Sequence, residues 1–109
     1  MKILAASICL LLITTAAIAQ PLTPEEEQEA RRLLVVFGCR ACHDFEKSGS
    51  TLAPSLDRIG RKLDEQAILK RLQRPPAKKK VPRDKFMPSY RSTPAEQLEL
   101  LSRFLAGRK

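Results

Sequence analysis

Three stretches of the chain carry apolar residues at the three- and four-residue spacing of an amphipathic helix. These positions are Ala30, Leu33, Leu34 and Phe37 in the first stretch, Ala67, Ile68, Leu69 and Leu72 in the second, and Leu98, Leu101, Phe104 and Leu105 in the third. Such spacing places the apolar side chains on one face of a helix, where they can pack into a core. Strand-like alternation persists nowhere. We therefore predict an all-α fold of three to four short helices joined by long loops.

The first helix has clear start and stop signals. Thr23 suits the N-cap, Pro24 suits the first helical position, and Glu26 can complete a capping box with Thr23. Gly38 is predicted to end or bend this helix just before residue 39. The helical pattern is then lost from residue 44 to residue 61, where small and turn-forming residues predict loops.

The second helix is predicted over residues 64–73, because Asp64 can cap its start and Pro75-Pro76 stops it. The stretch from residue 75 to residue 88 contains four prolines and the run Lys78-Lys79-Lys80. It is predicted to be an extended loop without regular structure.

The third helix repeats the start signal of the first in Thr93-Pro94-Ala95-Glu96. Thr93 is predicted as its N-cap, with Glu96 closing a second capping box. Gly107 is placed to end the helix.

Residues 1–19 have the pattern of a secretory signal peptide. Lys2 supplies a positive start, residues 3–13 are apolar, and Ala17-Ile18-Ala19 is an A-x-A cleavage pattern. The apolar part is short for a membrane span of roughly 20 residues, so the pattern favours a cleaved signal peptide over an uncleaved membrane anchor. We expect an exported, periplasmic domain at residues 20–109, with Cys9 removed along with the signal.

The exported domain has little material for a core of its own. It contains no Trp and one Tyr, and its two cysteines, Cys39 and Cys42, are too close together for a disulfide to restrain much chain. A large apolar group bonded to the chain would serve as the missing core. Loss of Lys2 leaves 19 Lys and Arg residues against 12 Asp and Glu, a net charge near +7. In an exported protein this charge favours an acidic protein partner over nucleic acid.

The residues Cys39-Arg40-Ala41-Cys42-His43 form a c-type haem attachment motif. Two thiols three positions apart can bond the two vinyl groups of one porphyrin, and the adjacent imidazole can ligate its iron. A dithiol oxidoreductase would need strands alternating with helices, and none are predicted. A closed zinc site would need four ligands, whereas the exported domain offers three obvious Cys and His candidates.

The second iron ligand is left with few candidates. His43 is the only histidine, and Met87 is the only methionine after residue 19. Ligation by Met87 would fill the iron's last position, raise its reduction potential and leave no place for a substrate. The alternatives are Lys85, one of Lys78 to Lys80, or an open site, and an open site would indicate a gas sensor or a peroxidase-like unit.

The chain resembles the class I, monohaem c-type cytochromes over the whole region after residue 19. The resemblance rests on four pieces in order: residues 39–43, Ala53-Pro54-Ser55-Leu56 running into Ile59-Gly60-Arg61, Phe86-Met87-Pro88-Ser89-Tyr90, and residues 98–105. It implies a small cytochrome c fold wrapped around one haem c. In that fold Cys39 and Cys42 anchor the haem and His43 and Met87 ligate its iron.

Two further residues enter through this resemblance. Pro54 matches a proline whose carbonyl accepts the free N–H of the iron-bound histidine, which fixes the ring and makes it a better donor. Arg61 matches an arginine that lies on the haem propionate side in some members, with Arg58 and Tyr90 as alternatives. The chain departs from the family at Ala53, where glycine is common.

The expected function is therefore electron transfer without catalysis in this chain. The carrier would be free or the haem subunit of a membrane-bound oxidoreductase. The basic stretch from Lys78 to Arg91 surrounds Met87 in the sequence, and we expect it to steer docking onto an acidic redox partner.

Overall fold

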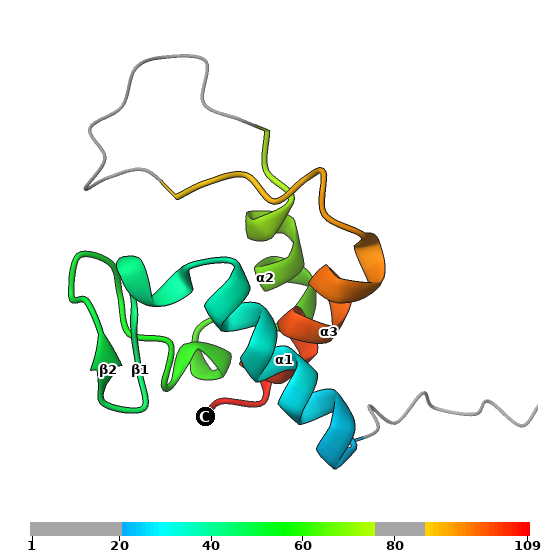
Figure 1. Ribbon diagram of the computed structural model, residues 1–109, viewed down its shortest axis with the longest axis horizontal. Coiled ribbons are helices and arrows are strands. Elements are labelled where there is room, and N and C mark those ends of the chain that lie inside the picture. The colour runs from blue at the N-terminus through cyan, green and yellow to red at the C-terminus, as the bar shows by residue number, and fades with distance from the viewer. Residues whose placement is uncertain (1–20, 76–86) are drawn as a thin grey trace, which may run out of the picture.

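The computed structural model of the protein describes residues 21–75 and 87–109 (Figure 1). The predicted signal segment at residues 1–19 and residues 76–86 of the predicted proline-rich loop lie outside this description. Those predictions therefore remain predictions. Within the two described ranges, no helix is both long enough and apolar enough to span a membrane.

Helix α1 covers Pro24–Val36 and begins as the sequence predicts. The Thr23 hydroxyl accepts a hydrogen bond of 3.1 Å from the Glu26 backbone N–H. The Glu26 carboxylate in turn accepts one of 3.2 Å from the Thr23 backbone N–H. The predicted capping box is confirmed, and it satisfies two backbone donors that the first turn leaves free.

Helix α2 covers Glu65–Leu72, and Asp64 caps it by accepting a 2.8 Å hydrogen bond from the Ala67 backbone N–H. Helix α3 covers Ala95–Ala106, and here the predicted start is wrong. Its N-cap is Pro94, with an extended ψ of 132° and no side-chain capping bond. Thr93 belongs to the preceding turn, because its backbone N–H donates to the Tyr90 carbonyl at 2.9 Å. The predicted capping box between Thr93 and Glu96 is therefore not formed.

A short β-hairpin interrupts the region that the sequence predicts to be loop. Strands β1 (Asp44–Phe45) and β2 (Ser48–Gly49) pair antiparallel, with Asp44 opposite Gly49 and Phe45 opposite Ser48. Two further short elements are the 3₁₀ turns η1 (Cys39–Ala41) and η2 (Ile59–Arg61). The described part is therefore mostly helical, as predicted, with one small hairpin added.

The hairpin turn adopts a backbone conformation that side chains rarely take. Glu46 and Lys47 have φ of 49° and 64°, in the left-handed region. The Glu46 carboxylate accepts hydrogen bonds from Arg31 of α1 at 2.9 Å and from Arg108 at 3.0 Å. The Glu46 backbone N–H donates to the Asp57 carboxylate at 2.7 Å. These bonds fasten the turn to α1, to the end of the chain and to its own return segment.

The core lies where α1 and α2 pack on α3, and Figure 1 shows α1 crossing in front of α3. The buried apolar side chains are Ala30, Leu33 and Leu34 of α1, Phe45 and Leu56 of the connecting segment, Ile68 and Leu72 of α2, and Leu98, Leu101, Phe104 and Leu105 of α3. The Phe45 and Phe104 rings meet edge to face with centroids 5.9 Å apart. Most positions of the three predicted apolar stripes are buried, whereas Phe37, Ala67 and Leu69 are half-buried.

The end of the chain rests against η2. The Gly60 backbone N–H donates to the Arg108 carbonyl at 2.8 Å. A Cβ atom at position 60 would overlap the carbonyl oxygen of Ala106, so only glycine allows this approach.

Candidate functional site

A cavity of about 460 Å³ brings together five residues that the sequence singles out. Cys39, Cys42, His43, Pro54 and Met87 all line it. They come from η1, from the loop that follows the hairpin, and from the segment ahead of α3. Residues separated by up to 48 positions therefore share one site.

The thiol side of the cavity is a single turn that leaves the end of α1. Gly38 has φ of 68°, the left-handed conformation that ends many helices, and its backbone N–H donates to the Val35 carbonyl at 3.1 Å. The backbone N–H groups of Cys42 and His43 both donate to the Cys39 carbonyl, at 3.3 and 2.9 Å. This turn presents both thiols and the imidazole to the same cavity.

Arg40, in the middle of the motif, does not line the cavity. Its guanidinium carbon lies 5.4 Å from the centroid of the Phe45 ring. The turn thus directs its thiols and imidazole to one side and its cation to the core aromatic on the other.

The His43 ring is oriented by the Pro54 carbonyl, 2.6 Å from Nδ1. A carbonyl oxygen only accepts hydrogen bonds, so Nδ1 carries the proton. In the neutral ring Nε2 then keeps its lone pair and is free to ligate a metal. This hydrogen bond is the one that the resemblance implies.

The loop that carries Pro54 is held against the motif by its backbone. The Ala53 backbone N–H donates to the Cys42 carbonyl at 2.8 Å, and that of Ser50 donates to the Arg40 carbonyl at 3.1 Å. Gly49 has φ of 114°, and a Cβ there would overlap the His43 carbonyl oxygen. Backbone contacts thus place Pro54 opposite His43, with Ala53 accommodated beside it.

The Met87 side of the cavity is joined to the thiol side by Tyr90. The Tyr90 hydroxyl donates a 2.7 Å hydrogen bond to the Phe37 carbonyl, and the two rings pack with centroids 4.9 Å apart. Met87 is half-buried and packs against the core. Because Phe37 directly precedes the turn of residues 38–43, this bond links the two walls.

Among the described residues, the charged side chains that line the cavity are Arg71 and Arg74, at the end of α2 and just beyond it. No Asp or Glu of residues 21–75 and 87–109 lines it. Leu52, 60 % exposed, forms an apolar part of the rim. The sequence analysis missed these three residues. The only signal was the placement of both arginines near the end of a predicted helix, and that helix could not be oriented from the sequence.

The two thiols are free, and Cys39 is half-buried. Burial raises the pKa of the Cys39 thiol to about 11. At neutral pH this sulfur is therefore protonated, unlike the thiolate of a dithiol oxidoreductase. Burial also raises the pKa of the Tyr90 hydroxyl, with smaller contributions from Cys39 and Cys42.

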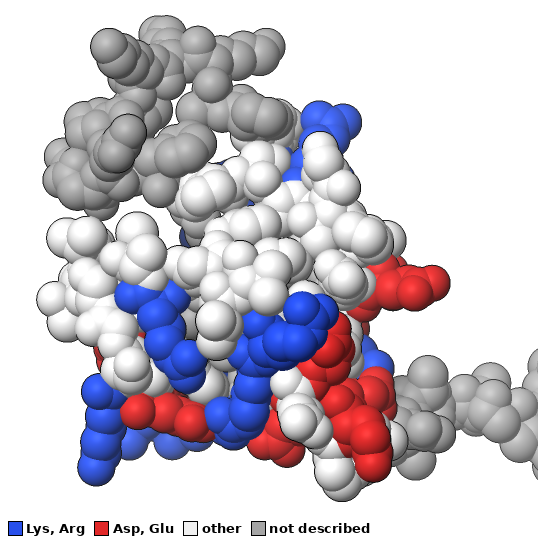
Figure 2. Space-filling view, in the orientation of Figure 1, with Lys and Arg blue, Asp and Glu red and all other residues white. Residues whose placement is uncertain are grey.

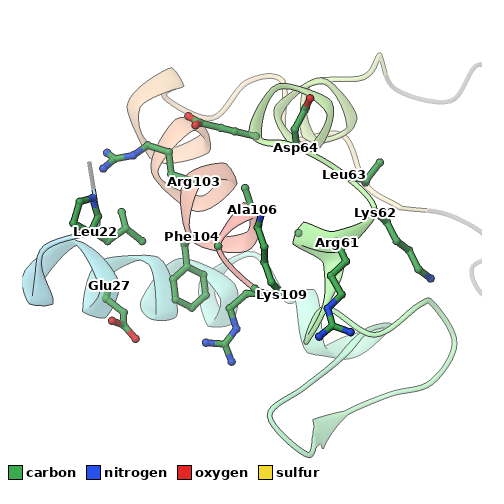
Figure 3. A pocket seen from close by; sticks show the side chains of 15 residues that line it. Leu22, Glu27, Arg61, Lys62, Leu63, Asp64, Arg103, Phe104, Ala106 and Lys109 are labelled. Atoms are coloured by element: carbon green, nitrogen blue, oxygen red, sulfur yellow. The ribbon is translucent and has the colours of Figure 1, made fainter. Parts of the chain in front are cut away.

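Arg61 lies elsewhere. It lines a second cavity of about 720 Å³, between the start of α1, the segment from Gly60 to Glu65 and the end of α3 (Figure 3). The contact of Gly60 with the end of the chain places η2 there. The structure therefore does not bring Arg61 to the cavity of Cys39 and His43, where Arg71 and Arg74 lie instead.

Charge is unevenly distributed over the visible face of the molecule. Figure 2 shows acidic side chains over the first half of α1, basic ones near the hairpin and an uncharged area above them. The exposed large apolar side chains in the described ranges are Val35, Val36 and Leu52.

Residues 21–75 and 87–109 contain no group of three or more Cys, His, Asp or Glu side chains placed to hold a metal ion. Comparison of the chain with protein-family models, with curated proteins and with solved structures found no match.

Proposed function

We propose that this protein carries one electron on a covalently bound haem c whose iron is ligated by His43 and Met87. The observation that carries the proposal is the single cavity lined by both thiols, His43 and Met87. The 2.6 Å contact between His43 Nδ1 and the Pro54 carbonyl supports it, because that contact leaves Nε2 free.

The cavity suits such a group in size and chemistry. Its 460 Å³ falls within the range of roughly 300–1,000 Å³ that cofactor pockets occupy. Apolar and aromatic residues line much of it, among them Phe37, Leu52 and Tyr90. A porphyrin bears two carboxylates, and the charged residues that line the cavity in the described part of the chain are the two cations Arg71 and Arg74.

Each residue has a separate task in this proposal. Cys39 and Cys42 form the thioether bonds, His43 donates Nε2, and Met87 donates its sulfur. When bound, the haem supplies the Fe(II)/Fe(III) couple. The Pro54 carbonyl holds the imidazole in its tautomer and orientation, and this makes Nε2 a stronger donor. With His43 and Met87 both holding the iron, the protein would exchange electrons and offer no place for a substrate.

The same proposal extends to the fold. We assign the described helices, η1 and the long loops to a small cytochrome c fold of the class I type, wrapped around the haem. In support, α1 leads directly into the thiol turn, and α3 follows directly on the segment that carries Met87.

The redox partner in this proposal is an exported or membrane-bound protein with an acidic docking surface. The basic stretch that would steer the encounter, Lys78 to Arg91, lies mostly outside the described residues. Its charge is a property of the sequence, and it adjoins the cavity at Met87.

Covalent attachment tests the proposal. The protein is expressed with its leader in cells that contain the c-type haem attachment machinery, purified and denatured, and the mass of the polypeptide is measured. We expect one haem to remain on the wild-type chain and on the Cys9→Ala control, and none on the Cys39→Ala, Cys42→Ala double variant. A wild-type polypeptide without haem would refute the proposal.

A further inference from the structure

The segment that brings Met87 to the cavity belongs to no helix or strand. Figure 1 shows it passing over the end of α2 before it enters α3. Three hydrogen bonds attach it to the end of α2. The Tyr90 backbone N–H donates to the Leu72 carbonyl at 2.9 Å, the Arg74 guanidinium Nη2 donates to the Met87 carbonyl at 3.1 Å, and the Ser89 hydroxyl donates to the Arg74 carbonyl at 2.5 Å.

We propose that Arg74 is the positioning residue for Met87. Its guanidinium fastens the Met87 main chain to the segment just beyond α2 and so would keep the methionine sulfur within reach of the iron. This inference rests on the proposed ligation by His43 and Met87, and it adds a residue that the haem motif does not contain.

Arg74 takes part in two hydrogen bonds with this segment, as the donor in one and as the acceptor in the other. Its side chain donates to Met87, while its backbone carbonyl accepts from Ser89, two residues further on. The bonds of Ser89 and Tyr90 hold the segment two and three residues beyond Met87, so the guanidinium bond is the one that fixes Met87 itself. The bond to Met87 is charge-assisted and therefore stronger than one from a neutral donor.

The location of these bonds determines where Met87 is held. Residues 74 and 87 stand at the two ends of the stretch from Pro75 to Phe86, so the bonds fix the ends between which that stretch runs. Met87 is then placed at the cavity wall by α2, a helix whose Ile68 and Leu72 are buried in the core. A ligand held by a rigid element loses less conformational entropy when it binds the iron.

Arg71 provides a matched comparison. It lies three residues before Arg74, lines the same cavity and carries the same charge. In the described part of the chain it forms no hydrogen bond with Met87 or with the residues up to Tyr90. Removal of the Arg71 side chain therefore takes away a cation from the cavity. Removal of the Arg74 side chain also takes away the bond at Met87 itself, while the bonds at Ser89 and Tyr90 remain.

The experiment compares Arg74→Ala, Arg71→Ala and Arg74→Lys in the haem-loaded protein. Imidazole competes with methionine for ferric iron, so its affinity reports how firmly the sulfur is held. Loss of one charge-assisted bond should make imidazole bind roughly tenfold more tightly to Arg74→Ala. Arg71→Ala, which removes a cation of the lining but no bond to Met87, should change imidazole affinity much less than Arg74→Ala. Arg74→Lys, which keeps a cationic donor, should recover part of the difference. Amide hydrogen exchange at Tyr90 should accelerate in Arg74→Ala alone.

Two results separate failure of this inference from failure of the proposed ligation. Equal imidazole affinity and equal Tyr90 exchange in Arg74→Ala and Arg71→Ala would overturn the positioning role. Equal imidazole affinity in wild type and Met87→Ala would refute ligation by Met87 itself. In that case the role of Arg74 at the iron falls with the ligation. Faster Tyr90 exchange in Arg74→Ala would then show only that Arg74 holds the Met87 segment against α2, and unchanged exchange would refute that attachment too.

Discussion

At the scale of single residues, the tautomer of His43 determines what the site can do. The Pro54 carbonyl accepts a hydrogen bond from the Nδ1–H group. Nε2 is therefore the ring nitrogen that keeps a free lone pair. An imidazole in the other tautomer could not ligate a metal from the same position. The chemistry of the site therefore depends on a backbone carbonyl eleven residues further along the chain.

Tyr90 offers a direct test of how the two cavity walls are joined. Tyr90→Phe keeps the ring contact with Phe37 but removes the 2.7 Å hydrogen bond to the Phe37 carbonyl. A partly buried carbonyl without its donor costs about 1–2 kcal/mol. We expect the free energy of unfolding, measured by denaturant titration of the haem-loaded protein, to fall by this amount. An unchanged midpoint and slope would show that the bond does not join the walls.

Some residues that line the cavity could be singled out from the sequence, and others could not. The spacing of Cys39, Cys42 and His43 singled them out, and elimination favoured Met87 over Lys85, Lys78 to Lys80 or an open site. The structure brings the four to one cavity. Arg71 and Arg74 could not be assigned, because their contacts depend on how α2 is oriented and on the chain beyond Pro75. Arg61 was expected at the haem propionates from the resemblance alone, and the contact of Gly60 with Arg108 places it at the second cavity instead.

At the scale of elements, ion pairs and close backbone contacts join α1, η2 and α3. Glu26 bonds to residues of two of these elements. Its carboxylate completes the capping box of α1 and also pairs with Arg103 of α3 at 3.0 Å. The hydrogen bond from the Thr23 backbone, followed by the charge of Arg103, lowers the pKa of Glu26 below its ordinary value of 4.5.

This pKa predicts an acid-sensitive contact between α1 and α3. Because the folded pKa lies below the unfolded one, the contribution of Glu26 is complete above pH 4.5 and is lost as the pH falls through the folded pKa. Glu26→Gln should therefore be less stable than wild type at pH 7, and the difference should shrink below pH 4.5. Thermal unfolding followed across this pH range measures it.

Glu25→Gln is the matched control for this prediction. It removes a carboxylate from the same turn of α1, but Glu25 forms no hydrogen bond within the described ranges. The same pH dependence in both variants would contradict the role given to Glu26.

The contact between η2 and the end of α3 is tested by Gly60→Ala. The added Cβ would overlap the Ala106 carbonyl oxygen, so the two elements must separate. Overpacking of this kind costs typically about 1–3 kcal/mol, and the melting temperature should fall accordingly. Gly107→Ala is the control, because its Cβ would lie 3.4 Å from the Phe104 carbonyl oxygen, where little has to move. Equal melting temperatures would show that the contact is not as close as described.

Element boundaries show where sequence reasoning succeeds and where it fails. The apolar spacing predicted all three helices, and the start signals located α1 and α2. The same Thr-Pro-x-Glu signal failed at α3, because Pro94 there is the cap itself and Thr93 bonds back to Tyr90. The hairpin was missed because two-residue strands show no alternation. Its Glu46-Lys47 turn also lacks the Asn-Gly type of signal that usually marks such turns.

At the scale of the whole molecule, positive charge is concentrated in the stretch of sequence that directly precedes Met87. Residues 76–86 contain five Lys and Arg residues and one Asp, so this stretch contributes much of the net charge near +7 that remains without residues 1–19. It joins α2 to the segment that carries Met87, at the cavity. We therefore expect an acidic partner to dock on the side of the molecule where Met87 lines the cavity.

Electron exchange with an anionic redox reagent tests this expectation. Replacement of Lys78, Lys79 and Lys80 by Gln should slow the second-order rate at low salt by roughly tenfold and flatten its dependence on ionic strength. The control replaces three other lysines, Lys47, Lys62 and Lys109, and should have a much smaller effect. A rate that does not depend on ionic strength in wild type would contradict the steering role of the stretch.

The central claim is that Met87 closes a six-coordinate, electron-carrying haem centre with His43. A redox titration followed by absorption spectroscopy, on wild type and Met87→Ala, tests it most directly. The account predicts a one-electron transition in both proteins. The weak near-red band of methionine-ligated ferric haem should appear only in wild type, with a lower potential and ready binding of CO by reduced iron in Met87→Ala. Identical spectra and potentials in the two proteins, with CO bound by both, would contradict it and would indicate an open-site haem protein instead.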